Sequence, residues 1–87
     1  MRFEVAEIQS TPNPNALKFV LTRPVADQPI SFFNPEAAAN HPLAAKLFAV
    51  PGVSSLLLLN DFITVNRKPE ASWSEIKKAV RKVLANA

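Results

Sequence analysis

The sequence has 87 residues, a net charge of +3, 48% hydrophobic and 20% charged residues, and no cysteine. This size allows one domain with a modest core, and the charge permits an acidic partner without requiring one. The lack of cysteine excludes disulfides, cysteine nucleophiles and all-cysteine metal sites. The sequence also has no run of about 18 apolar residues, the length that would predict a membrane-spanning helix. The first residues alternate like a strand and lack the apolar stretch of a signal peptide. We therefore expect one domain over residues 1–87, in the cytoplasm and not in a membrane.

Two strands open the chain. Residues 2–9 alternate apolar and polar side chains and predict the first strand, with a bulge near Glu7 where the alternation breaks. Residues 16–22 predict the second strand, with Phe19 on one face and Lys18 on the other. The connection between them is too short for a parallel crossover, so we expect the pairing to be antiparallel.

The connection at residues 11–15 reads Thr-Pro-Asn-Pro-Asn and is the most constrained stretch of the chain. Its two prolines fix φ and remove backbone donors, and its two asparagines can bond their own backbone. A loop whose shape is set in advance loses little entropy on binding, which suits a docking surface. A stiff turn that only fixes the strand register is the simpler interpretation. The residues that we expect to contact a partner are Thr11, Pro12, Asn13, Pro14, Asn15 and Lys18.

Prolines shape the middle of the chain. Pro24 and Pro29 exclude a helix in their neighbourhood, and residues 30–33 predict a short extended segment at a sheet edge. An Asn-Pro pair then predicts a helical turn over residues 35–39. A helix is expected over residues 42–49, because leucines recur there at helical spacing and a Pro-Gly pair follows.

Residues 53–59 and 62–67 predict two more strands, joined by a two-residue Asn-Asp hairpin. The first of them contains four consecutive leucines, so neither of its faces is plainly solvated. One face would meet the helices, and the other must pack on something or stay exposed as an interaction surface. We expect an exposed apolar surface around Leu56 or Leu58 as a second partner-binding candidate.

The last helix is expected to start at Ser72, whose spacing to Glu75 fits a capping box. From Trp73 onward, apolar residues form one stripe and basic residues gather on the other side. The basic side is most simply a solvated face whose cations suit a helix C-terminus, and alternatively a nucleic-acid-binding surface. The residues of that alternative are Arg67, Lys77, Lys78, Arg81 and Lys82.

The element order ββαββα predicts an α+β fold: a single domain with a four-stranded, mainly antiparallel sheet and two main helices on one face. No pattern predicts catalysis or a metal site. His41 stands alone beside a proline, Asp61 sits in a hairpin turn, and Glu4 and Glu7 point to opposite faces of a strand. We therefore expect no catalytic residue, no metal ligand and no cofactor, and so no enzyme.

Residues 11–19, Thr-Pro-Asn-Pro-Asn-Ala-Leu-Lys-Phe, resemble the signature of the N-terminal domain of Nfu/NifU-type iron–sulfur scaffold proteins. Residues 42–48, 50–53 and 60–65 are similar to further segments of that family, and Trp73 falls where its closing helix begins. The resemblance implies an accessory role in iron–sulfur protein maturation, through contact with cluster-assembly components or their clients. It also implies iron binding, but through thiolates of a Cys-x-x-Cys pair in a separate C-terminal domain.

The sequence thus predicts a stand-alone, non-catalytic module that binds another protein and is a monomer or a weak homodimer. Without cysteine, the chain cannot hold an iron–sulfur cluster in the usual all-cysteine way. A small nucleic-acid-binding module that uses the basic last helix is the alternative function.

Overall fold

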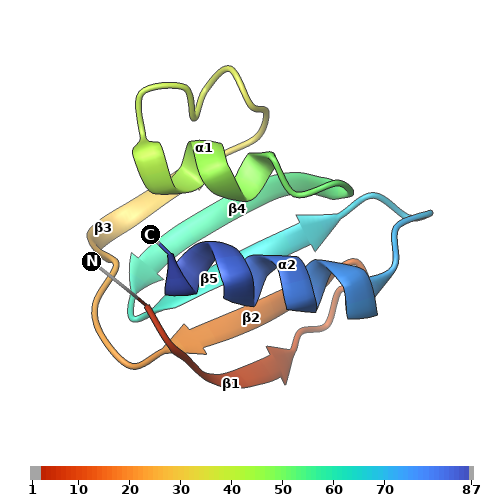
Figure 1. Ribbon diagram of the computed structural model, residues 1–87, viewed down its shortest axis with the longest axis horizontal. Helices are drawn as coiled ribbons and strands as arrows, with labels where there is room; N and C mark the ends of the chain where they lie inside the picture. The colour runs from red at the N-terminus through yellow and green to blue at the C-terminus, as the bar shows by residue number, and fades with distance from the viewer. Residues whose placement is uncertain (1–2, 87) are drawn as a thin grey trace.

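The computed structural model describes residues 3–86, over which one five-stranded sheet packs against two helices. In chain order the elements are β1 (Val5–Ser10), β2 (Ala16–Leu21), β3 (Ala26–Phe32), α1 (Pro42–Phe48), β4 (Val53–Asn60), β5 (Phe62–Arg67) and α2 (Trp73–Ala85) (Figure 1). The strands lie in the order β1-β2-β5-β4-β3, and all neighbours are antiparallel. The predicted α+β class with an antiparallel sheet and two main helices is confirmed.

The prediction of four strands is wrong by one, because β3 is a strand of seven residues rather than a short extended segment. It contains Pro29, which is why only residues 30–33 were predicted to be extended, and their predicted place at a sheet edge is confirmed. A proline cannot donate to a sheet ladder, but β3 is an edge strand that pairs only with β4, so the missing donor costs little there. The pairing is irregular between Ala26 and Ile30, next to this proline. The element order is therefore βββαββα.

The core lies between the sheet and the two helices, which cover the same face (Figure 1). A strand exposes alternate residues to each face, so β2 and β5 each send every second side chain to the helices. The largest fully buried side chains are Phe19, Leu47, Leu56, Leu58, Ile63, Val65, Ile76, Val80 and Leu84. Neither helix covers the opposite face of the sheet.

The leucines of β4 are placed differently from the prediction. Leu56 is 2% exposed and Leu58 is fully buried, so the expectation of an exposed surface around them is wrong. Leu57 and Leu59 are half-buried on the uncovered face of the sheet instead. The cause is the register, which pairs Leu58 with the buried Ile63. Four identical residues in a row carry no alternation from which this register could be inferred.

The turn and helix boundaries follow the predicted local chemistry closely. Residues 35–39 form turns with i to i+3 backbone hydrogen bonds, as expected. Helix α1 starts after His41, whose Nδ1 accepts the Ala44 N–H at 3.1 Å. Helix α2 starts after Ser72, but the Ser72 hydroxyl bonds the hydroxyl of Ser74 at 2.9 Å, so the predicted capping box does not form.

Strand β1 spans Val5–Ser10 rather than residues 2–9, and residue 2 lies outside the described residues. The predicted bulge is confirmed, because the register with β2 shifts between Val5 and Glu7. The two-residue hairpin between β4 and β5 is also confirmed, with Asn60 at a φ of 52°. Among residues 3–86, no helix is both long enough and apolar enough to cross a bilayer.

Candidate functional site

The loop between β1 and β2 is closed by its own hydrogen bonds. The Asn13 Oδ1 accepts the Asn15 N–H at 2.8 Å, and the Asn13 carbonyl accepts the Ala16 N–H at 3.0 Å. The Thr11 Oγ1 accepts the Asn13 N–H at 3.1 Å and lies within 3.0 Å of the carbonyls of Asn13 and Ala16, to one of which it donates. Because the Asn13 and Thr11 side chains bond nearby backbone, contacts within residues 11–16 help to define the shape of the loop.

Two residues from the other end of the chain fasten this loop to the domain. The Asn15 carbonyl accepts the Arg67 N–H at 2.7 Å, and the Asn15 Oδ1 accepts the Arg67 Nε–H at 3.3 Å. The Trp73 Nε1–H donates to the Pro14 carbonyl at 3.2 Å. The Arg67 guanidinium also lies 5.2 Å from the centre of the Trp73 ring, within cation–π range. The loop, the end of β5 and the start of α2 therefore form one connected unit.

The tip of the loop is open to solvent. Pro12, Asn13 and Pro14 are exposed, whereas Thr11 and Asn15 are half-buried. The Asn13 Nδ2 group makes no hydrogen bond to any of residues 3–86 and is available for an external acceptor. The structure thus divides the predicted contact residues into an exposed tip, which we call the loop tip (Pro12, Asn13 and Pro14), and two flanking residues whose side chains hold it in place.

Lys18 does not extend the loop tip. Its side chain lies on the uncovered face of the sheet, with Nζ 4.2 Å from the centre of the Phe62 ring. Lys18 pairs with Thr64, and Phe62 pairs with Val20, so the ammonium leans along the sheet away from the loop. A cation–π contact of this kind holds the ammonium over the aromatic face. The structure therefore separates Lys18 from the other predicted contact residues.

The residues of the nucleic-acid alternative also divide into two groups. Lys78, Arg81 and Lys82 are exposed on α2, and Lys77 on the same helix is half-buried. Arg67 lies at the end of β5, where its Nη1 donates to the Ala71 carbonyl at 2.9 Å and its Nε to the loop. Arg67 thus belongs to the loop unit and not to the basic face of α2.

Sequence reasoning missed Trp73 as a member of this site. The sequence predicts Trp73 to start the last helix and its apolar stripe, but a partly buried tryptophan also needs an acceptor for its indole N–H. Its acceptor is 59 residues away in the sequence, and only the fold brings the two together. The one signal in the sequence that could have pointed to Trp73 is that it is the single tryptophan, next to a helix start, in a chain without tyrosine.

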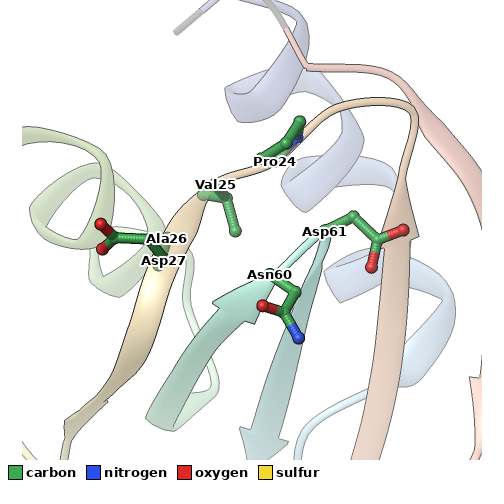
Figure 2. Close-up of a pocket in the computed structure, with 6 residues that line it drawn as sticks. All are labelled: Pro24, Val25, Ala26, Asp27, Asn60 and Asp61. Carbon is green, nitrogen blue, oxygen red and sulfur yellow. The ribbon is translucent and has the colours of Figure 1, made fainter.

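The described residues contain no converging set of metal donors. No group of three or more His, Cys, Asp or Glu side chains among residues 3–86 could hold an ion. An open hollow lies beside the β4–β5 hairpin and is lined by Pro24, Val25, Ala26, Asp27, Asn60 and Asp61. Figure 2 shows that its two carboxylates, from Asp27 and Asp61, point away from each other. This hollow therefore lacks the geometry of a metal site.

The sequence matches the model of a known protein family. The family model described as "Scaffold protein Nfu/NifU N terminal" matches residues 6–87. The chain therefore belongs to the family of Nfu/NifU scaffold N-terminal domains, as the loop signature predicted.

Curated relatives and solved structures agree with this assignment. The chain is 40% identical over 79 residues to the human protein named NFU1 iron-sulfur cluster scaffold homolog, mitochondrial, covering 88% of this chain and 31% of that protein. It is 36% identical over 93 residues to a NifU-like protein of Schizosaccharomyces pombe, covering 95% of this chain and 36% of that protein. The chain thus spans about a third of the length of these relatives.

Two solved structures share the fold. The solution structure of a NifU-like protein from Saccharomyces cerevisiae has a TM-score of 0.79 and 30% identity, covering 97% of this chain and 77% of that chain. A crystal structure of a Staphylococcus aureus protein also has a TM-score of 0.79, with 23% identity, covering 92% and 96% of the two chains. At that identity the second likeness shows the fold alone.

An iron–sulfur cluster does not fit the residues of this chain. Cysteine thiolates are the usual ligands of such clusters, and the sequence contains none. His41 is the one histidine, and its Nδ1 accepts a backbone N–H at the start of α1. The usual ligands of an iron–sulfur cluster are therefore missing from this sequence.

Proposed function

We propose that this chain is a non-catalytic protein-interaction module in iron–sulfur protein maturation, and that it docks through the loop tip. The main support for this proposal is that an exposed Pro-Asn-Pro segment is fixed by internal hydrogen bonds and fastened by Arg67 and Trp73. Such a segment pays little entropy when a partner binds, because its shape is already set. Tryptophan and arginine next to it are also the residue types that are enriched at binding hot spots.

The relatives supply the class of partner. Proteins named as iron–sulfur cluster scaffolds share this domain and are about three times longer, so the partner proposed here is a cluster-assembly component or one of its clients. The chain itself would contribute recognition, since its residues do not fit a cluster. We also propose a cytoplasmic location. Several relatives carry the word mitochondrial in their names, so microscopy of the tagged chain in its source cell tests this point.

Capture from an extract of the source cell tests the function. The tagged full chain and its Asn13→Asp variant would be compared, with bound proteins identified by mass spectrometry. Aspartate keeps the Oδ1 that accepts the Asn15 N–H, so the loop keeps its shape, but it replaces the exposed amide with a negative charge. We expect iron–sulfur assembly or client proteins on the original chain and a clear loss of them on the variant.

Asn34→Asp is the matched control. Asn34 is also an exposed turn residue, and its Oδ1 accepts the Ala37 N–H at 2.8 Å, so the chemical change is the same at a distant place. This control should capture the same proteins as the original chain. Capture without any iron–sulfur protein would refute the proposed role, and equal loss in both variants would refute the loop tip as the docking surface.

A further inference from the structure

A groove runs along one flank of α2, beside α1. Figure 1 shows the two helices next to each other over the same sheet face, and they are in direct contact. One hollow of this groove is lined by Lys46, Ala49, Lys82, Val83 and Asn86. The adjoining hollow, which shares Lys82, is lined by Ser74, Glu75, Lys78, Ala79 and Lys82. Because residues three and four apart on a helix share a side, the α2 residues of both hollows form one continuous stripe.

The groove has an apolar floor and a basic rim. Ala49, Ala79 and Val83 provide aliphatic surface, and Ala79 and Val83 are half-buried. Lys46, Lys78 and Lys82 are exposed around this floor. One carboxylate, that of Glu75, lies among the lining residues, at the end nearest the start of α2.

The favourable interaction of lysines with the helix dipole explains only two of the three lysines of this basic rim. Lys46 and Lys82 lie in the last turns of their helices, where cations suit the helix dipole. Lys78 lies in the middle of α2, four residues before Lys82, and like charges at this spacing on a helix repel each other. Carboxylates of a bound partner would relieve that repulsion.

We propose that this groove binds an acidic amphipathic segment of a partner protein. The carboxylates would meet the lysine rim, and small apolar side chains of the segment would lie on the alanine and valine floor. The groove extends over residues 74–86, about three and a half helical turns, which matches a peptide helix of similar length. Single-stranded nucleic acid fits less well, because binding to it relies on aromatic stacking and no aromatic side chain lines either hollow. This proposal is independent of the loop tip.

Fluorescence anisotropy with two labelled probes tests it. The first probe is a peptide of about 12 residues, with alanine and leucine at helical spacing and glutamate elsewhere, and the second is a uridine oligonucleotide of the same length. The full chain should bind the peptide more tightly than the oligonucleotide. Lys46→Glu combined with Lys82→Glu should weaken peptide binding by about tenfold or more, because it reverses two of the three positive charges of the rim.

Two further variants separate the groove from general charge. Lys68→Glu combined with Arg81→Glu makes the same change in net charge at exposed sites outside the groove lining, and should change peptide binding by less than about twofold. Ala49→Arg adds positive charge but fills the floor, and should weaken peptide binding. Equal weakening by the two double variants, tighter binding by Ala49→Arg, no detectable peptide binding, or preference for the oligonucleotide would each overturn the proposal.

Discussion

Gly52 is the residue whose identity the fold constrains most directly. Its φ is +96°, a conformation that side-chain-bearing residues rarely adopt, and it follows the end of α1 as a Pro-Gly pair predicts. A Cβ at this position would lie 2.6 Å from the Ala71 Cβ and 3.3 Å from the Ile76 Cδ1. The glycine thus allows the turn before β4 to pass close to the start of α2.

Gly52→Ala should therefore destabilise the domain by about 2 kcal/mol or more, from backbone strain and from the clash with Ala71. Urea unfolding followed by circular dichroism measures this change. Ala37→Gly makes the reverse substitution at an exposed turn position and serves as a mild control. An unchanged urea midpoint for Gly52→Ala would contradict the packing described for this turn.

Trp73 gives a second prediction at the scale of single residues. Trp73→Phe keeps an aromatic ring near Arg67 but removes the hydrogen bond to the Pro14 carbonyl, so it should cost about 1 kcal/mol of stability. The loop amides of Asn15 and Ala16 should also exchange hydrogen faster, because the loop loses one of its attachments. Unaltered exchange at these amides would show that the tryptophan does not fasten the loop.

The loop shows what the sequence can and cannot predict about single residues. Its stiffness was predictable, because proline and asparagine impose their geometry locally and Thr11 and Asn13 bond backbone within five residues. Its attachment to Arg67 and Trp73 was not predictable, because those partners are more than fifty residues away in sequence. The separation of Lys18 from the loop was not predictable either, because it depends on the contact of the Lys18 ammonium with the ring of Phe62, a residue distant in sequence.

At the scale of elements, β4 shows how cross-strand pairing assigns roles to identical residues. Leu58 pairs with Ile63 inside the core, whereas Leu57 pairs with Thr64 on the uncovered face. Leu58→Ala should cost about 2–5 kcal/mol, as is usual for a fully buried leucine. Leu57→Ala removes the same atoms from a half-buried site in the same strand, so it should cost less than about half of that. Similar urea midpoints for the two variants would contradict the register.

The helices and β3 differ in how well their sequences specify them. The starts of both helices and the end of α1 were predicted within a residue, because capping residues and apolar spacing are local signals. Strand β3 was predicted only in part, as an extended segment over residues 30–33 at a sheet edge, because Pro29 argues against a strand through the residues before it. Its partner β4 follows after an intervening helix, so no hairpin signal connects the two.

The molecule is a sheet with one face covered by helices, a loop fixed at one end of that sheet, and a groove along one flank of α2. Its Nfu/NifU family and α+β class were predictable from the loop signature and the element order. The proposed docking role adds the claim that recognition uses the loop tip, which neither family nor fold implies. That claim connects the residue and element scales, because β5 and α2 hold the loop tip in place.

Isothermal titration of the chain with an iron–sulfur partner captured from the source cell tests this claim most directly. Asn13→Asp should raise the Kd by at least about tenfold, equivalent to about 1.4 kcal/mol, because it places a charge at the contact while the loop keeps its shape. Asn34→Asp should leave the Kd within about twofold of the original value, since it makes the same change at a distant turn. An equal Kd for all three proteins would contradict docking through the loop tip.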